Sequence, residues 1–95
     1  QYRRRRELIV NGLNAIDGVT CMAPKGAFYA FPNIRATGLS SRDFAIRLLK
    51  EQHVVTVPGT GFGAGGEGYI RLSYATSEEV IREGLKRIKT FVDSL

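Results

Sequence analysis

A single arginine stands in the middle of an apolar stretch that has the composition of a β-strand. The neighbours of Arg71 in the sequence are Tyr69, Ile70, Leu72 and Tyr74. A guanidinium is always charged, and a strand in a covered sheet is a costly place to leave it without a partner. The adjacent sequence offers no obvious acidic group, although such an arginine requires a carboxylate or a phosphate. We therefore predict that the partner of Arg71 is a ligand.

The segment before this strand is dense in glycine, at positions 59, 61, 63, 65, 66 and 68. Glycine permits backbone conformations that a side chain would forbid. Residues 61–66 match the pattern G-x-G-x-x-G, but a dinucleotide site also requires a helix to open at those glycines. Residues 68–75 instead have the pattern of a strand, and no helical pattern begins before Ser77. We therefore reject a nucleotide site; on pattern alone, a flexible surface loop between two strands is the simplest interpretation.

Other residue types that could do chemistry are not combined into a reaction centre. His53 is the only histidine, so no Ser, Thr or Cys has a recognisable base beside it. Lys25 lies in a Pro-Lys-Gly turn and the lysines at 50, 86 and 89 have charged neighbours, so none resembles a desolvated lysine poised to form a Schiff base. Cys21 has no cysteine partner and no metal-ligating neighbours, which favours an intracellular, metal-free protein with Cys21 as a core residue at a strand.

Length and charge limit the classes of protein to consider. Ninety-five residues form one domain at most. No apolar run reaches the roughly 18–20 residues that cross a bilayer, and no signal peptide is visible, so we expect a cytoplasmic protein without membrane contact. The net charge is +5, and four of the fourteen basic residues lie in the run 3–6. Four consecutive arginines on a helix point in four directions and lack interleaved aromatic residues, so we interpret them as a solvated face; a basic α+β module that binds nucleic acid is the alternative.

The elements that must position Arg71 begin with a helix over residues 2–16, which ends at Asp17-Gly18. One face of this helix carries Ile9, Leu13 and Ile16. Short strands are predicted over residues 19–22 and 27–31, the second stopped by Pro32, and together they are expected to form a hairpin.

The second half repeats the alternation of strands and helices. Ser40 with Asp43 predicts the start of a helix that continues to Gln52. Its apolar side comprises Phe44, Ala45, Leu48 and Leu49. Buried strands are predicted over residues 54–57 and 68–75. Thr76 with Glu79 predicts the start of a terminal helix, whose apolar stripe is Ile81, Leu85, Ile88 and Val92. The order α-β-β-α-β-β-α predicts a small α+β domain, with a sheet of about three to four strands packed against helices.

Three motifs in this order resemble a known family. Residues 24–34 read PKGAFYAFPNI, residues 57–63 read VPGTGFG and residues 66–75 read GEGYIRLSYA. They resemble the C-terminal small domain of class I (fold type I) pyridoxal-phosphate-dependent aminotransferases, in particular the bacterial and archaeal aspartate-aminotransferase-like group. The opening residues 2–7 and the closing helix fit as well, so the resemblance covers residues 1–95 as one domain.

The resemblance implies that Arg71 grips the α-carboxylate of the amino-acid substrate. A planar guanidinium binds a carboxylate through two parallel charge-assisted hydrogen bonds, which would hold the substrate near the cofactor and favour closure of the small domain. Gly59, Gly61 and Gly63 would let the chain turn sharply near the site. The aromatic residues that follow Ala27 are expected to serve core and hairpin packing, namely Phe28, Tyr29 and Phe31.

The chain also departs from the pattern of the complete enzymes that it resembles. Their Schiff-base lysine follows a Ser or Thr by three residues, whereas here the residues three before the lysines are Met22, Arg47, Glu83 and Lys86. Together with a start at Gln1 inside a helix, this predicts a fragment without the large cofactor-binding domain. We expect it to contain no catalytic or cofactor-binding residues, to bind no pyridoxal 5′-phosphate and to be inactive alone.

The resemblance implies a homodimeric transaminase for the complete protein. Such an enzyme moves an amino group between an amino acid and a 2-oxo acid, with pyridoxal phosphate as electron sink. A pyridoxal-phosphate lyase or synthase of the same fold is the alternative. The substrate side chain and the oligomeric state of the fragment do not follow from the sequence.

Overall fold

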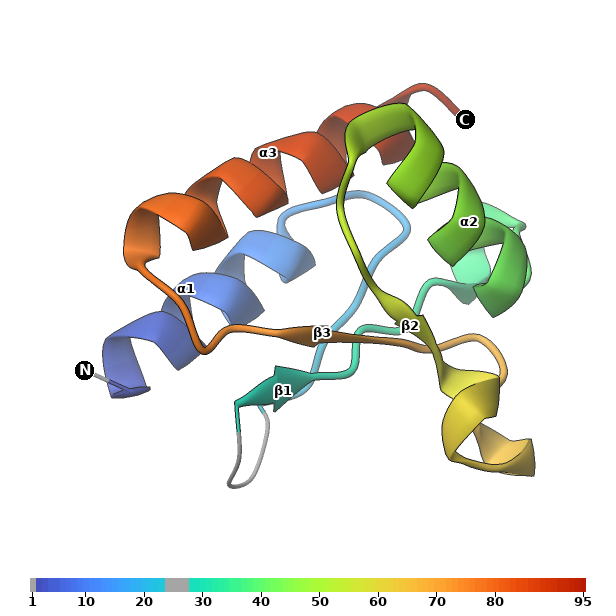
Figure 1. Cartoon of the computed structure of the whole chain (residues 1–95), viewed down its shortest axis with the longest axis horizontal. Coiled ribbons are helices and arrows are strands. Elements are labelled where there is room, and N and C mark those ends of the chain that lie inside the picture. The colour runs from blue at the N-terminus through green and yellow to red at the C-terminus, as the bar shows by residue number, and fades with distance from the viewer. Residues whose placement is uncertain (1, 24–27) are drawn as a thin grey trace.

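Three helices lie on one face of a small antiparallel sheet within residues 2–23 and 28–95, which the computed structural model describes (Figure 1). The helices are α1 (Tyr2–Asn14), α2 (Ser41–Gln52) and α3 (Glu78–Asp93). The strands are β1 (Tyr29–Ala30), β2 (Val57–Pro58) and β3 (Ile70–Ser73). Short 3-10 turns are η1 (Arg35–Thr37), η2 (Gly59–Phe62) and η3 (Ala64–Gly66). The predicted α+β class, with a small sheet packed against helices, is confirmed.

The longest strand, β3, lies in the centre of the sheet. The strand order is β1-β3-β2, and both neighbours run antiparallel to β3. Along β3, Ile70 and Leu72 are buried, whereas Arg71 and Ser73 retain exposure. Because successive side chains of a strand point to opposite faces, the buried pair faces the helices and Arg71 faces the side that they leave open.

The core lies between the helices and the sheet. At its centre, the rings of Phe44 in α2 and Phe91 in α3 meet nearly edge to face, with centroids 5.2 Å apart. Ile9, Leu13 and Ile16 are buried, as the spacing along the first helix predicts. The apolar side of α2 is confirmed for Phe44, Ala45 and Leu48, but Leu49 is 47% exposed. Phe91, which the predicted stripe of α3 omits, is fully buried.

Serine side chains define where two helices begin. The Ser40 hydroxyl accepts a hydrogen bond from the backbone N–H of Asp43, as the predicted start of α2 requires. At α3, the Ser77 hydroxyl accepts from the N–H of Val80, so the prediction that Thr76 starts this helix is wrong by one residue. The first helix ends at Asn14, two residues earlier than predicted, and Gly18 adopts the expected left-handed conformation at φ 88°.

The first half of the chain contains less strand than the sequence predicts. Residues 19–22 form only an isolated antiparallel bridge, between Thr20 and Asn33. The partner of β1 is β3, so the predicted hairpin of residues 19–22 with residues 27–31 is wrong. The intervening residues 24–27, which include Lys25, lie outside the described residues. The strand that pairs with β1 is thus distant in the sequence, which local patterns of β-propensity do not reveal.

The strand predicted over residues 54–57 is also displaced. It begins only at Val57 and ends at Pro58, and Val55 is 74% exposed. β-branched residues favour strands, but tertiary contacts decide which of them pair. In the part of the chain that is described, no helix is long and apolar enough to cross a membrane.

Candidate functional site

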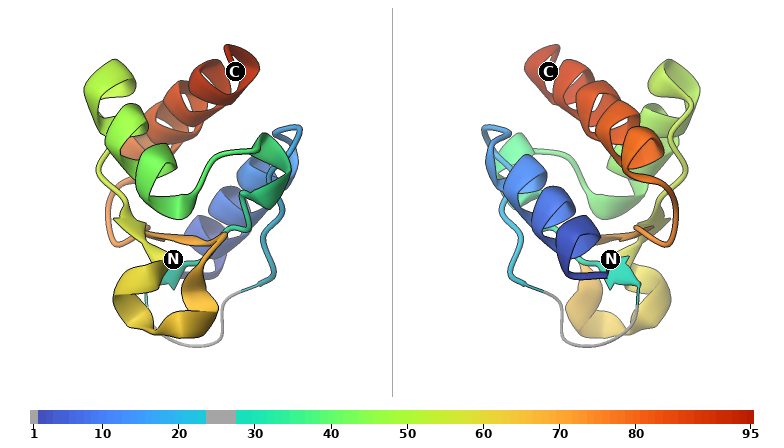
Figure 2. Two further views of the ribbon diagram at one scale, coloured as in Figure 1. Left: turned by 90° about the vertical axis from the view of Figure 1, so that its right-hand side faces the viewer. Right: turned by 90° about the vertical axis from the view of Figure 1, so that its left-hand side faces the viewer.

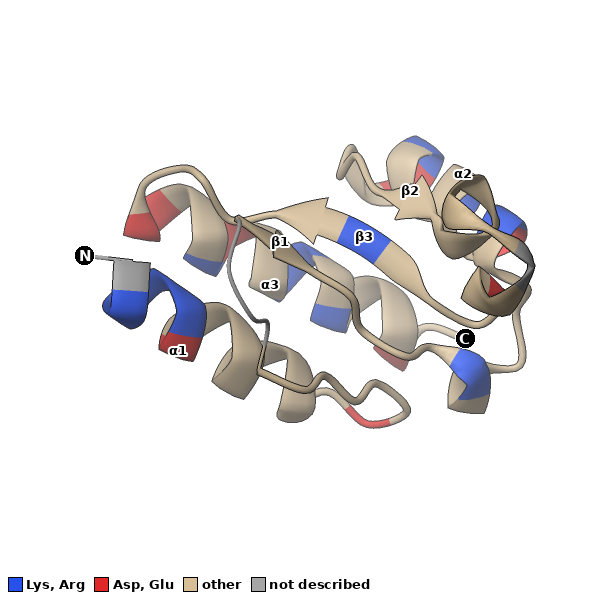
Figure 3. Ribbon diagram, turned by 90° about the horizontal axis from the view of Figure 1, so that it is seen from below, with Lys and Arg blue, Asp and Glu red and all other residues tan. Residues whose placement is uncertain are grey.

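Arg71 lies on the open face of the sheet, between side chains from both neighbouring strands. The register places Val57 opposite Arg71, and it pairs Tyr29 with Ser73, two residues along β3. Tyr29 is therefore a diagonal neighbour of Arg71 on the same face. Figure 3 views the sheet from the side that the helices leave open and shows the basic position within β3. The central strand thus presents a cation at the middle of an uncovered surface.

Two aromatic rings enclose the Arg71 guanidinium. Its central carbon lies 4.5 Å from the ring centroid of Tyr29 and 4.5 Å from that of Phe62, the last residue of η2. Phe31 meets Phe62 at nearly a right angle, with centroids 5.9 Å apart. Both contacts of the guanidinium have the geometry of cation–π interactions. A ring face is not a directional acceptor of the carboxylate kind, so the two rings do not satisfy the N–H groups of the guanidinium.

The prediction that Tyr29 and Phe31 serve core packing is wrong. Tyr29 is 41% exposed and Phe31 47%, while Ala30 between them is fully buried. Phe28 does pack against the core, with its ring 6.3 Å from the ring of Tyr74. The alternation of residues 28–31 between the two faces could have revealed this arrangement, because Phe28 and Ala30 share one face and Tyr29 and Phe31 the other.

Several acidic groups of the described residues have partners other than Arg71. Five ion pairs are present there, and each uses a basic residue other than Arg71: Arg4, Arg47, Arg82, Arg87 and Lys89. Glu67, which is near Arg71 in the sequence, binds the start of α2 instead. One of its carboxylate oxygens accepts from the backbone N–H of Ser41 at 2.9 Å and the other from the Ser41 hydroxyl at 3.0 Å. Within the described residues, no carboxylate pairs with the guanidinium of Arg71.

The contact of Glu67 fixes one end of the glycine-rich loop. The N–H of Ser41, at the first position of α2, has no acceptor within its own helix, and the carboxylate satisfies it at the positive end of the helix dipole. These hydrogen bonds from Ser41 hold the pKa of Glu67 below its usual range. Arg35 adds a hydrogen bond of 2.8 Å to the carbonyl oxygen of Glu67 and lies over the ring of Tyr69. The sequence reveals none of this, because Glu67 and Ser41 are 26 residues apart.

Two glycines close the same loop. A Cβ on Gly59 would lie 2.1 Å from the carbonyl oxygen of Gly66, and a Cβ on Gly66 would lie 1.9 Å from the carbonyl oxygen of Gly59. The N–H of Gly59 also donates to the carbonyl of Tyr69 at 2.7 Å. The backbone therefore crosses itself where only glycine fits. Figure 2 shows the turns η2 and η3 projecting on the side of the sheet away from α2 and α3. The glycines open no α-helix, as the rejection of a dinucleotide site assumes.

The described residues do not fit a pyridoxal-phosphate pocket. A Schiff-base lysine must be desolvated to lose its proton, whereas Lys50, Lys86 and Lys89 are all exposed. Asp93 raises the pKa of Lys89, which favours the charged form further. His53 is exposed and ends α2 in a left-handed conformation at φ 59°. No cluster of three or more metal-ligating side chains occurs among the described residues.

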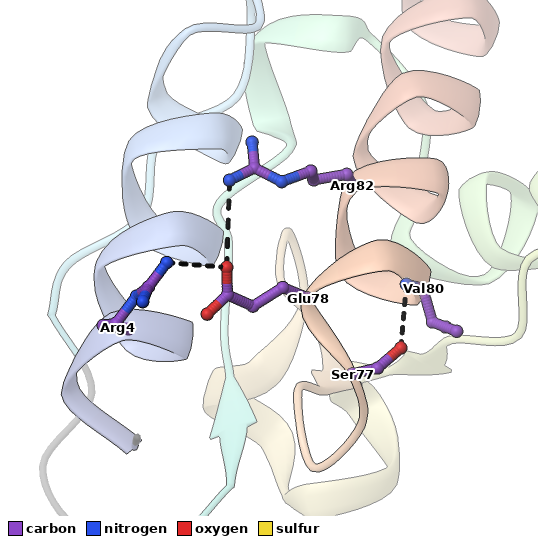
Figure 4. Close-up of polar contacts among 5 residues, drawn as sticks. All are labelled: Arg4, Ser77, Glu78, Val80 and Arg82. Atoms are coloured by element: carbon purple, nitrogen blue, oxygen red, sulfur yellow. Dashed lines mark hydrogen bonds and ion pairs between the residues drawn. The ribbon is translucent and has the colours of Figure 1, made fainter.

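The arginine run at the start of α1 is divided between different surroundings. Arg3 and Arg4 are exposed, whereas Arg5 and Arg6 are half-buried. Arg4 pairs at 3.2 Å with Glu78, and Arg82 approaches the same carboxylate at 3.9 Å (Figure 4). A carboxylate thus joins the first turns of α1 and α3. This arrangement agrees with a solvated helix face and does not form a continuous basic stripe for nucleic acid.

Comparison with known proteins identifies the family. The family model described as aminotransferase class I and II matches residues 1–88. The chain therefore belongs to the class I and II aminotransferase family.

Relatives across this family share both sequence and fold with the chain. The protein YugH of Bacillus subtilis (strain 168) is 56% identical over 91 residues, which cover 96% of this chain and 23% of the relative. An aspartate aminotransferase of Pyrococcus horikoshii is 49% identical over 89 residues, covering 94% and 23%. The crystal structure of an aromatic aminotransferase from Pyrococcus horikoshii OT3 superimposes with a TM-score of 0.93 at 47% identity, covering 98% and 24%. The chain spans about a quarter of the length of these proteins.

Proposed function

We propose that this chain is the C-terminal small domain of a pyridoxal-phosphate-dependent aminotransferase and that Arg71 binds the α-carboxylate of its substrate. The observation that carries the proposal is the placement of Arg71 on an open sheet face, held by two rings and without an acidic partner among the described residues. A carboxylate could approach the guanidinium from this face and form two parallel hydrogen bonds with it. Family membership supports an amino acid as the source of that carboxylate.

In this proposal the chain contributes binding and orientation. The cofactor supplies the electron sink for the transfer of an amino group between an amino acid and a 2-oxo acid. The exposed lysines agree with a division of labour in which the remaining three-quarters of the parent protein hold the cofactor. Arg71 would fix the substrate so that its reacting carbon meets the cofactor, and movement of the small domain would exclude water. The isolated chain is then inactive, and the complete enzyme is a cytoplasmic homodimer.

The test of the clamp is Arg71→Lys in the full-length parent enzyme. Lysine keeps the charge but loses the planar fork, so kcat/KM for the amino acid should fall by about 10- to 150-fold, as for loss of a charge-assisted hydrogen bond of about 1.5–3 kcal/mol.

Arg82→Lys is the matched control, because Arg82 is exposed on α3 and makes only a long ion pair. Its kcat/KM should stay within about twofold of the unmodified enzyme. A loss smaller than about threefold for Arg71→Lys, under 0.7 kcal/mol, would show that this arginine is not the carboxylate clamp.

A further inference from the structure

The cation of the site is held from two independent elements. Tyr29 belongs to β1, where pairing with β3 fixes its register. Phe62 belongs to η2, in the loop that the crossing of Gly59 and Gly66 closes. The rings of both residues lie 4.5 Å from the central carbon of the Arg71 guanidinium. Two separate parts of the fold therefore converge on one side chain.

The loop that carries Phe62 is anchored at both ends. At its start, Gly59 donates to the carbonyl of Tyr69 at 2.7 Å. At its end, the carboxylate of Glu67 binds Ser41 at the start of α2. This bracing explains how an exposed phenylalanine on a glycine-rich loop can keep a defined position over the arginine. Without it, the many glycines would leave the ring free to move.

An arginine side chain that no neighbour holds in place loses conformational entropy when it binds a ligand. Its long side chain has many rotamers, and ordering them on binding consumes part of the interaction free energy. Stacking on ring faces restricts those rotamers in advance, while the N–H groups remain free for an acceptor. Partial exposure of Tyr29 and Phe62, at 41% and 45%, leaves the edge of this assembly accessible.

We infer that Tyr29 and Phe62 are positioning residues that pre-orient Arg71 for the carboxylate. The inference rests on the proposed function of Arg71 and extends it to two residues that contact the guanidinium only through their ring faces. Removing either ring frees the arginine, so the affinity for the carboxylate falls while the chemistry that follows binding changes less. The aromatic ring, and not the tyrosine hydroxyl, carries the effect.

The experiment uses the full-length parent enzyme with Phe62→Leu and Tyr29→Leu, and with Phe62→Tyr and Tyr29→Phe as matched controls that retain a ring. Each leucine variant should lower kcat/KM for the amino acid by about 3- to 30-fold, mainly through a higher KM, which is the range of a cation–π contact. Both ring-retaining variants should stay within about twofold. Calorimetry should measure the binding of the substrate analogue in which hydrogen replaces the amino group. Its Kd should rise by the same factor in each leucine variant.

A double variant separates positioning from a general structural role. In an Arg71→Gln background, Phe62→Leu should lower kcat/KM by less than about twofold, because no cation remains for the ring to orient. An equal loss in both backgrounds would overturn the inference. Circular dichroism selects a temperature at which every variant is folded, and Phe62→Met replaces Phe62→Leu if the latter does not fold.

The remaining outcomes distinguish the inference from the proposed function. If Arg71→Lys lowers kcat/KM while both leucine variants remain within twofold, the positioning role is wrong and the clamp stands. If Arg71→Lys itself has no effect, the clamp is wrong, and the positioning role falls with it.

Discussion

Two neighbouring leucines in α2 show how strongly the burial of a side chain depends on the helix face that carries it. Leu48 is fully buried against the core, whereas Leu49 is 47% exposed. Apolar residue type alone does not distinguish the two, and the sequence places both on the apolar side. Successive residues are 100° apart around a helix, so Leu49 lies beyond the face of α2 that carries Leu48 into the core.

The two leucines therefore provide a matched pair for a stability measurement. Leu48→Ala removes a fully buried side chain and leaves a cavity, so the free energy of unfolding should fall by about 2–5 kcal/mol. Leu49→Ala removes a half-exposed side chain and should cost less than about 1 kcal/mol. Urea unfolding of both variants beside the unmodified chain measures the difference, and equal losses would contradict the burial described for α2.

At the same scale, the sequence identifies the cation but not its surroundings. Arg71 is conspicuous because a charge interrupts an apolar strand. Tyr29 and Phe62 are not, because aromatic residues beside a strand are more often core, and their meeting requires a register that joins residues far apart in the chain. Cys21 is buried as expected, and burial raises the pKa of its thiol, although it lies outside a strand.

Within the glycine-rich loop, neighbouring glycines should differ in how well they tolerate substitution by alanine. Gly66→Ala would place a Cβ 1.9 Å from the carbonyl oxygen of Gly59, and backbone atoms cannot move aside as a flexible side chain can. We expect a loss of about 1–3 kcal/mol in the free energy of unfolding, as for an overpacked site.

The adjacent glycine is the control for this loop. A Cβ on Gly65 would meet nothing within 4 Å, and its φ is not in the left-handed region. Gly65→Ala should leave stability unchanged or raise it by about 0.4–1 kcal/mol, because alanine restricts the unfolded chain. Thermal unfolding of both variants compares them, and a Gly65→Ala loss as large as that of Gly66→Ala would argue against the crossing at Gly66.

The junction between this loop and α2 should depend on pH. The pKa of Glu67 is lowered in the folded chain, so its contribution to stability is present above the range in which an unfolded glutamate titrates. It is lost as the pH falls through the lowered folded pKa, where the carboxylate gains a proton and no longer accepts both hydrogen bonds from Ser41 as an anion.

Glu67→Gln measures this contribution. The glutamine variant should be less stable than the unmodified chain at neutral pH, and the difference should shrink in acid because both side chains are then neutral. Denaturant unfolding across a pH series records it. Glu7→Gln serves as the exposed control on α1 and should show a smaller difference at neutral pH. A Glu67→Gln difference that stays constant into acid would contradict the role of the charge.

Helices of this chain are largely predictable from sequence, and the strands are not. The predicted caps, Ser40 and Thr76, locate the starts of α2 and α3 to within a residue, because a capping signal is local. The described strands β1 and β2 comprise two residues each, so their pairing depends on β3 and on the helices above it. Hence the expected hairpin of residues 19–22 with residues 27–31 is replaced by pairing across the chain.

For the molecule as a whole, the two-layer arrangement follows from the alternation of helical and extended patterns. The family could be recognised from three short motifs, at residues 24–34, 57–63 and 66–75, and the family model that matches residues 1–88 confirms it. Two contacts could be found only in the structure: the binding of Glu67 to the start of α2, and the crossing of Gly59 with Gly66. Both join segments whose proximity produces no periodic pattern in the sequence.

Because the helices cover only one face of β3, neighbouring residues of this strand are constrained by different properties of the protein. Substitutions at Ile70 and Leu72 enter the packed layer and would be removed from a mutant library by a screen for abundant protein. In the proposed role of Arg71, its substitutions would pass such a screen and be removed only by a screen in which growth requires the parent enzyme to make its product. The tolerance of β3 to substitution should therefore alternate with a period of two. The screen for abundance should detect changes on the buried face, and the screen for activity should detect changes at Arg71 on the open face.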